Sequence, residues 1–116
     1  MTIVEFDDNG RRTGEAQVEK VVKTDEEWRQ RLSPDEFEVA RKRGTERPFT
    51  GKLNKNFADG IYRCVCCGTA LFDSKTKFDS GTGWPSFFAS IAAENIVERV
   101  DDSHGMVRVE ILCARC

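Results

Sequence analysis

The alternation of apolar and polar positions is clearest close to the C-terminal end of the chain. Val107, Val109 and Ile111 occupy every second position there, which predicts a strand with one face buried. Residues 96–100 predict another strand before them, and the Asp- and Gly-containing segment 101–105 in between is typical of a turn. Together the two runs predict a β-hairpin.

Shorter runs of the same kind begin near residue 48. The segments 61–65 and 70–72 contain β-forming side chains and are separated from their neighbours by Gly, Asn and Asp. We therefore expect an antiparallel β body over residues 45–116.

Two capping signals predict short helices ahead of this β body. Thr24 and Glu27 have the spacing of a capping box, and Ser33 and Glu36 repeat that spacing. Trp28 lies on the apolar side of the first helix and is expected in the core.

Turn residues predict where these helices and the N-terminal segment change direction. Gly44 suits the left-handed residue that ends the second helix. Asn9 with Gly10 is typical of a turn, within a polar arm or short strand. The predicted organisation is a single domain over 1–116, made of an arm over 1–23, helices over 24–44 and the β body over 45–116.

Composition and charge narrow the class of protein. The chain has 116 residues, of which 39% are hydrophobic and 33% charged, so one folded domain fits its length. Its 18 Lys and Arg residues nearly balance its 20 Asp and Glu residues, which gives no electrostatic reason to expect nucleic acid or an anionic membrane as a partner. No stretch is apolar enough to span a bilayer, and the first residues lack the pattern of a secretory signal. We expect a cytoplasmic monomer.

Five cysteines, all in the second half of the chain, carry the strongest chemical signal. Cys64 with Cys67 and Cys113 with Cys116 form two C-x-x-C pairs, a spacing that lets both thiolates of a pair reach one ion. The pattern predicts a tetrahedral site for one Zn²⁺ per chain. Because four thiolates leave no coordination position for water, this zinc is expected to be structural.

A tryptophan framed by glycine and proline adds a second signal. Residues 81–87 read Gly-Thr-Gly-Trp-Pro-Ser-Phe, which would present a large aromatic face on a rigid loop suited to a small apolar or sulfur-containing group. Taken with the segments 44–51, 62–72, 103–110 and 113–116, this motif closely resembles the type B methionine sulfoxide reductases (MsrB). The resemblance extends over residues 24–116.

The resemblance implies a fold, a cofactor and an activity. The fold is two antiparallel sheets with N-terminal helices and a structural zinc, and the activity is reduction of the R epimer of methionine sulfoxide, free or in proteins. In that family a cysteine thiolate attacks the sulfoxide sulfur, a sulfenic acid forms, and a thioredoxin-like or other thiol reductant restores the enzyme. By their place in the motif, Trp84, Pro85 and Phe87 are expected to bind the substrate, with Trp84 against its methyl group.

The sequence departs from the family pattern in two ways. MsrB proteins continue past the second C-x-x-C pair into an H-L-G-H-V-F segment and an R-Y-C-x-N strand with the nucleophile, and these 116 residues contain neither. We therefore expect no catalytic residue in this chain, no turnover by it alone, and a C-terminally incomplete domain. Thr82 also stands where many members hold a resolving cysteine, which leaves Cys66 either as a resolving thiol or as a reduced bystander.

One functional alternative remains open. A non-catalytic zinc-binding β module that binds a protein partner is compatible with the missing nucleophile. His104 is the only histidine, and we expect it to stabilise the turn in which it lies, because the resemblance places the catalytic histidines of the family beyond the second cysteine pair.

Overall fold

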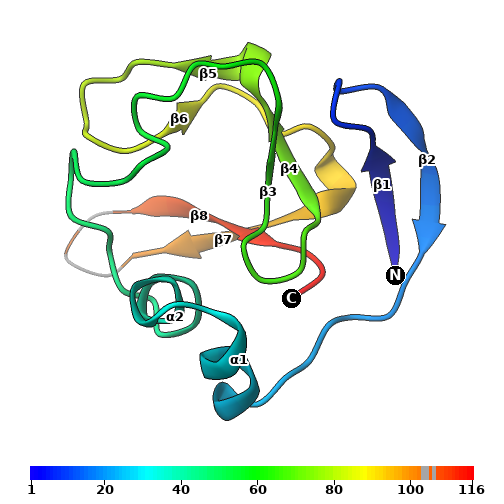
Figure 1. Ribbon diagram of the computed structural model, residues 1–116, viewed down its shortest axis with the longest axis horizontal. Helices are drawn as coiled ribbons and strands as arrows, with labels where there is room; N and C mark the ends of the chain where they lie inside the picture. Colours follow the sequence, from blue (N-terminus) through cyan, green and yellow to red (C-terminus); the bar gives the residue numbers. More distant parts are fainter. Residues whose placement is uncertain (103–104, 106) are drawn as a thin grey trace.

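Two short helices follow an N-terminal hairpin, and short strands make up most of the remaining regular structure (Figure 1). The computed structural model describes residues 1–102, 105 and 107–116. Its helices and strands are β1 (Thr2–Phe6), β2 (Arg12–Gln17), α1 (Asp25–Arg31), α2 (Pro34–Arg41), β3 (Ile61–Arg63), β4 (Ala70–Asp73), β5 (Lys77–Phe78), β6 (Ser86–Phe87), β7 (Ile96–Asp101) and β8 (Arg108–Cys113), with 3₁₀ turns η1 (Ser74–Thr76) and η2 (Ala93–Asn95).

Every strand in the described part of the chain pairs antiparallel with a neighbour in sequence. The pairs are four two-stranded sheets, β1–β2, β3–β4, β5–β6 and β7–β8. The predicted fold class, mainly β with two short helices on the N-terminal side, is confirmed, and its strands form four small sheets where two were expected. Strand length accounts for the number, since β5 and β6 have two residues each and offer a third strand little to pair with.

Both predicted capping boxes are present. The hydroxyl of Thr24 accepts a hydrogen bond from the backbone N–H of Glu27 at 3.2 Å, and the hydroxyl of Ser33 accepts one from Glu36 at 3.2 Å. Each glutamate also accepts from the backbone N–H of its cap residue. The two caps therefore fix where α1 and α2 begin.

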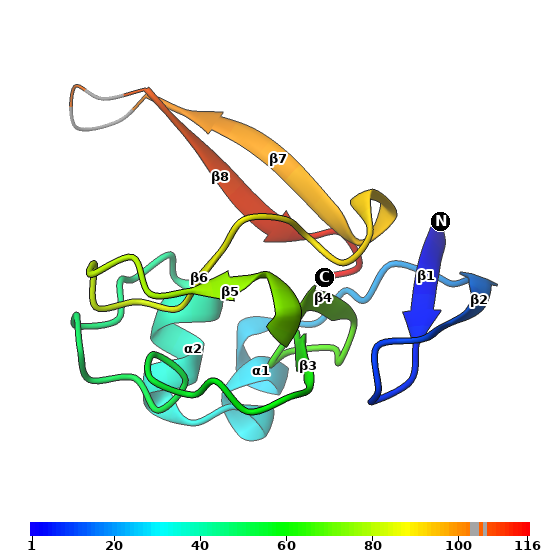
Figure 2. The same cartoon turned by 90° about the horizontal axis from the view of Figure 1, so that it is seen from above.

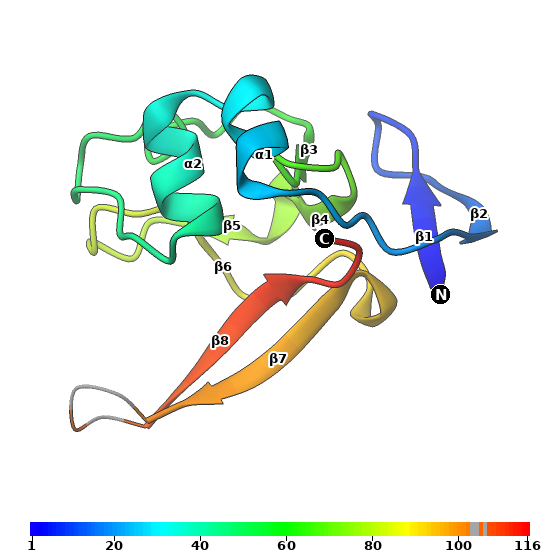
Figure 3. The ribbon, with the colours of Figure 1, turned by 90° about the horizontal axis from the view of Figure 1, so that it is seen from below.

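The core lies where the helical segment packs against the first cysteine turn. Trp28, Leu32 and Phe37 form a buried cluster with Cys66, and Trp28 is 0% exposed, as predicted. Figure 3 shows α1 and α2 side by side, next to the β3–β4 sheet. Neither helix of the described residues is long and apolar enough to cross a membrane.

The end of α2 differs from the prediction. Arg43, with φ of 61°, takes the left-handed conformation expected of Gly44. Gly44 is instead required by a close approach, because its N–H donates to the carbonyl of Glu38 at 2.9 Å and a Cβ at position 44 would lie 2.9 Å from the same oxygen. The glycine was correctly placed at the helix end but for the wrong physical reason.

The N-terminal segment forms a hairpin where an arm or a short strand was expected. β1 and β2 pair around the predicted turn at Asn9 and Gly10, and φ of Gly10 is 84°. No apolar pattern predicts β2, because its side chains are mostly polar. Ile3 and Val4 are 4% and 1% exposed, so β1 is buried against the rest of the molecule, with β2 on its outer side (Figure 2).

The predicted C-terminal hairpin is confirmed, but its apolar face is not buried. β7 and β8 pair from Ile96↔Cys113 to Asp101↔Arg108. Val109 and Ile111, which were expected on a buried face, are 58% and 45% exposed. Figure 2 shows the hairpin extending away from the body of the molecule. Alternation determines which side chains share a face but not whether another element covers that face.

Candidate metal centre and tryptophan loop

The structure brings together the four cysteines of the two C-x-x-C pairs. Their sulfur atoms all lie within 4.8 Å of one another, with Cys64 Sγ 3.6 Å from Cys116 Sγ and Cys67 Sγ 3.5 Å from Cys113 Sγ. Four thiolates around one zinc at about 2.3 Å would have their sulfurs roughly 3.8 Å apart. The cluster therefore fits a tetrahedral metal ion, and zinc would be held by these four residues alone.

Backbone hydrogen bonds shape the first cysteine turn, between β3 and β4. The N–H of Cys64 donates to the carbonyl of Thr69 at 2.9 Å, and the N–H of Gly68 donates back to the carbonyl of Cys64 at 2.9 Å. Gly68 has φ of 80°, a conformation that favours glycine. This tight turn points both thiols of the pair toward one place.

The second cysteine turn follows β8 and is held by residues from two other elements. The N–H of Ala114 donates to the backbone carbonyl of Asn95 at 3.0 Å. The carbonyl of Cys116 accepts from the guanidinium of Arg41 on α2 at 3.3 Å. In Figure 1 the C-terminus lies beside the β3–β4 turn, so the two cysteine turns meet although 45 residues separate Cys67 from Cys113.

Hydrogen bonds within the cluster shift the pKa values of its thiols in opposite directions. Bonds from Cys116 and Cys64 stabilise the thiolate of Cys113 and lower its pKa. The same interaction with Cys113 raises the pKa of Cys64 to about 12 and also raises that of Cys116. The cluster thus already favours one thiolate, and a bound cation would favour the deprotonated form of every ligand.

Cys66 lies between these ligands in sequence but points into the core. Its side chain is 2% exposed and packs with Trp28, Leu32 and Phe37. A thiol must reach its partner sulfur directly for disulfide exchange, so this burial disfavours the resolving role considered for Cys66 and agrees with a reduced bystander.

A rigid loop between β5 and β6 presents Trp84. Gly81 and Gly83 have φ of 74° and 90°, and a Cβ at position 83 would lie 2.8 Å from Phe49. The indole is 36% exposed, and its Nε1–H donates to the carbonyl of Glu46 at 2.6 Å. Because one edge of the ring is tied to the backbone, its orientation is fixed while part of its surface remains open.

Small hydroxyl side chains hold the base of the same loop. Ser80 Oγ lies 2.8 Å from Thr82 Oγ1 and 2.7 Å from Ser86 Oγ. Thr82, the residue at the resolving-cysteine position, is therefore part of this network. These bonds restrict the backbone on both sides of Trp84 and half-buried Pro85.

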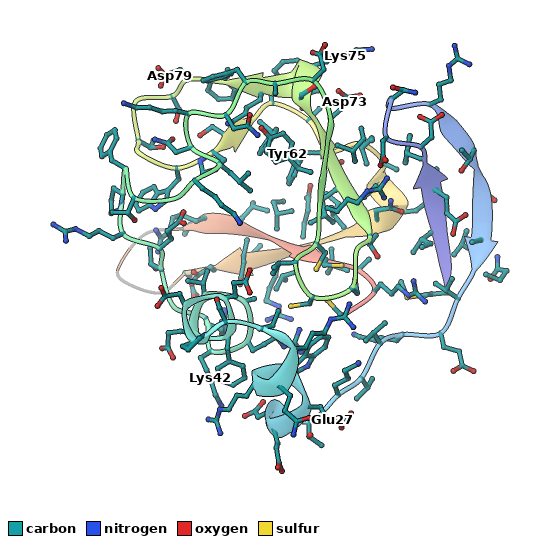
Figure 4. The ribbon with its side chains drawn as sticks, viewed as in Figure 1. Glu27, Lys42, Tyr62, Asp73, Lys75 and Asp79 are labelled. Carbon is teal, nitrogen blue, oxygen red and sulfur yellow. The ribbon has the colours of Figure 1, made fainter. Side chains whose placement is uncertain are left out.

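Phe87 lies in an aromatic cluster of the sheets. Its ring stacks on Phe72 with a centroid distance of 4.3 Å and meets Tyr62 edge-on at 4.9 Å. Tyr62 is labelled in Figure 4. The expected substrate residues thus differ in surroundings, because Trp84 keeps an exposed surface whereas Phe87 on β6 packs against Phe72 and Tyr62.

Comparisons with known proteins agree with this combination of features. The SelR domain matches residues 32–116. The chain is 56% and 57% identical over 99 residues to proteins named peptide methionine sulfoxide reductase MsrB from Pseudomonas putida strain F1 and Pseudomonas fluorescens strain Pf-5, and 54% identical to one from Pseudomonas syringae pv. syringae. Each alignment covers 85% of this chain and 76% of the relative. The chain belongs to the MsrB family.

Membership of the MsrB family confirms the resemblance drawn from the motifs. The match at residues 32–116 includes both cysteine pairs and the tryptophan loop. The β1–β2 hairpin, at residues 2–17, precedes that match.

Lys77 is a buried residue of this MsrB domain that sequence reasoning missed. Its side chain is 9% exposed, and its ammonium lies 4.6 Å from the ring centroid of Phe57 and 5.4 Å from that of Tyr62. It donates to the backbone carbonyls of Leu53, Asn54 and Asn56. The local sequence Lys-Thr-Lys-Phe gives no hint of this role, because the acceptors are backbone atoms more than twenty positions away.

The tryptophan loop and the cysteine cluster lie in different parts of the molecule. The β5–β6 loop is at the upper left of Figure 1 and the C-terminal residue Cys116 is near the centre, and Figure 2 separates them in the same way. Trp84 is tied to Glu46, and Phe49 N–H donates to the carbonyl of Gly83 at 2.8 Å. His104, expected to stabilise the β7–β8 turn, lies outside the described residues.

Proposed function

We propose that this domain binds methionine-R-sulfoxide, free or in proteins, and belongs to a reductase that converts it to methionine. The observation that carries the proposal is the fixed, partly exposed indole of Trp84 on a chain of the MsrB family. The names of its relatives from Pseudomonas point to the same substrate class.

The Trp84 ring supplies a surface suited to the substrate. A sulfoxide polarises its methyl group, and an aromatic face attracts such a group electrostatically and through contact with sulfur. The bond to Glu46 removes the freedom of the ring to rotate away. Pro85 restricts the backbone next to it, and Phe87 supports the loop from the sheet.

We assign the four-cysteine cluster to one structural Zn²⁺. Bound to four thiolates, zinc supplies a cross-link between the two cysteine turns and no open position for chemistry. Sulfur separations of 3.5 and 3.6 Å support this assignment. Cys64, Cys67, Cys113 and Cys116 are the proposed ligands.

The proposed chemistry follows the thiol route of the family. A cysteine thiolate attacks the sulfoxide sulfur, oxygen passes to the cysteine as a sulfenic acid, and the thioether leaves as methionine with protons supplied by histidine. Two thiols of a thioredoxin-like or other reductant then regenerate the cysteine, form a disulfide and release water. We propose that the nucleophile and the paired histidines lie outside these 116 residues, in segments equivalent to the H-L-G-H-V-F and R-Y-C-x-N motifs.

The free thiols support a reducing compartment, and the core supports a single domain. All five cysteines are free thiols in the structure, which suits a reducing compartment such as the cytoplasm. The shared core of the helices and the first cysteine turn supports one domain. We propose that it works as a monomer with no nucleic-acid or membrane partner.

The test is reduction of each methionine sulfoxide epimer by the protein purified as the cell makes it, with dithiothreitol as reductant. We expect turnover of the R epimer only. Trp84→Ala should lower kcat/KM by roughly tenfold, as expected for a lost aromatic contact to a polarised methyl group. Phe88→Ala is the matched control, because Phe88 is a nearby aromatic residue with 72% exposure. Equal losses in both variants would argue against a substrate contact at Trp84.

A second candidate is a non-catalytic zinc-binding module. The exposed apolar face of the β7–β8 hairpin favours it, since Val100 and Val109 are paired there and are 68% and 58% exposed, and such a face suits a protein partner. Full zinc occupancy without turnover of either epimer would support this candidate over the reductase.

A further inference from the structure

Residues 1–21 precede the SelR match at 32–116, and they bond to Arg115 in the second cysteine turn and to Arg63 next to the first. We call this segment the brace; it contains β1, β2 and the chain up to Val21. We infer that the brace, acting through Asn95 as a positioning residue, holds the two cysteine turns against each other and slows the loss of their metal ion. The inference rests on the zinc site proposed above.

Asn95 connects the brace to the first cysteine turn. Its side chain is 0% exposed. The N–H of Val4 on β1 donates to Oδ1 at 2.8 Å, and Nδ2 donates to the carbonyl of Val4 at 2.8 Å and to that of Ala70 at 2.9 Å. The amide therefore pairs with Val4 as a neighbouring strand would, and both of its donor hydrogens are used.

Asn95 thus bonds a residue close to the first cysteine turn, and it also bonds the second turn. Ala70 is the first residue of β4, three positions after the ligand Cys67 of the first turn. Ala114, between the ligands Cys113 and Cys116, donates to the backbone carbonyl of Asn95 at 3.0 Å. One buried residue thus links β1 to a segment next to each half of the cysteine cluster.

Two further contacts join the brace to residues adjacent to the ligands. Val21 N–H donates to the carbonyl of Arg115 at 2.7 Å. The guanidinium of Arg63, next to Cys64 in sequence, donates to the carbonyl of Phe6 at 3.1 Å and to Asp8 Oδ1 at 3.2 Å. Figures 1, 2 and 3 all place β1 on the side of β4 and the C-terminus.

These contacts bear on metal retention because neither cysteine turn holds four ligands alone. Metal loss requires at least one ligand pair to move away from the other, which is a local opening of the structure. Burial of Ile3 and Val4, at 4% and 1% exposure, attaches the brace firmly to the segments that must move. Removing the Asn95 amide leaves the backbone of buried Val4 without its partners and makes opening more frequent.

The experiment measures the rate of zinc transfer from the purified full chain to a colorimetric chelator. Asn95→Ala should release zinc roughly tenfold faster than the wild type, because buried backbone groups lose their hydrogen bonds. Arg63→Met, at a partly exposed site, should release it about twofold faster. Asn9→Ala, an exposed asparagine in the β1–β2 turn, should leave the rate unchanged.

A second control separates metal retention from overall stability. Lys77→Met destabilises the domain at Leu53, Asn54 and Asn56, where Lys77 bonds, and none of these residues belongs to the brace or the cysteine turns. It should lower the urea midpoint without accelerating zinc release. If Asn95→Ala and Lys77→Met accelerate release in proportion to their loss of stability, the positioning role of Asn95 is wrong.

Three further results would each support or overturn the inference. Wild-type release rates in folded Asn95→Ala and Arg63→Met proteins would overturn it while leaving the zinc site intact. If Asn95→Ala fails to fold, the rate for Arg63→Met alone decides between the two views. A wild-type chain purified without zinc would instead overturn the proposed metal site, and the inference with it.

Discussion

A single buried polar side chain can bond to several backbone groups of this domain in a segment that has no strand partner. Lys77 illustrates this, because one ammonium satisfies the carbonyls of Leu53, Asn54 and Asn56 in a segment without strands. That segment leads back to Glu46 and Phe49, which contact the tryptophan loop. Burying an ammonium costs less free energy when carbonyl oxygens replace the water molecules that would otherwise bond to it.

Lys77→Met is therefore expected to destabilise the protein by about 2–3 kcal/mol, because it leaves carbonyl groups without a donor. Urea unfolding measures the change. Lys75→Met is the matched control, because it removes the same charge at an exposed site. The Lys75 side chain points outward in Figure 4. Equal destabilisation by both substitutions would mean that the charge, and not the hydrogen bonds, is responsible.

The residues of the tryptophan loop could be identified from sequence because their chemistry is local. Gly81, Gly83 and Pro85 restrict the backbone around Trp84 directly. The motif did not determine which ring would face solvent, and Phe87 instead joins Phe72 in an aromatic stack. That choice depends on residues from a different strand, which no local pattern contains.

The start of a helix can be predicted from neighbouring residues, whereas a polar strand cannot. The capping boxes at Thr24 and Ser33 were read from sequence, and both are present, because a cap bonds only to residues three positions away. Strand β2 was missed, since its polar residues pair with β1 without burying an apolar face.

The first turn of α1 should make stability depend on pH. The ammonium of Lys42 lowers the pKa of Asp25, and hydrogen bonds from Thr24 lower the pKa of Glu27. Both carboxylates therefore stabilise the folded state when ionised, and this contribution is lost as pH falls from about 5 through their lowered pKa values. Glu27 and Lys42 are labelled in Figure 4.

Thermal unfolding between neutral pH and about pH 3 measures this effect. The melting temperature should fall with pH, and it should fall less steeply in Thr24→Ala, where Glu27 loses the bonds that lower its pKa. Thr2→Ala is a suitable control at a site remote in sequence from both caps. Parallel pH profiles for wild type and Thr24→Ala would contradict the proposed contribution of the cap.

At the scale of the whole molecule, stability should depend on the bound ion. All four sheets in the described part of the chain have only two strands, and such pairs are weak on their own. The cysteine cluster joins the β3–β4 turn to the end of β8, so metal binding and folding are expected to be coupled.

Removing zinc with a chelator, or replacing a ligand by Cys113→Ser, should abolish cooperative thermal unfolding. Circular dichroism and metal analysis on the same samples measure both properties. Cys66→Ala is the matched control, because Cys66 is buried but lies outside the cluster; it should cost about 1–2 kcal/mol and keep its zinc. An unchanged melting curve after complete metal removal would refute a structural role for zinc.

The sequence by itself determined the features whose causes lie within a few residues. Helix caps, the Asn9-Gly10 turn, the cysteine spacings and the rigid frame of Trp84 are of this kind, and the last two also belong to the motifs that identified the family. The tertiary structure decided the burial of Lys77 and Asn95 and the exposure of Val109. Those outcomes depend on partners that are distant in sequence and meet only when the chain folds, so no periodicity or spacing encodes them.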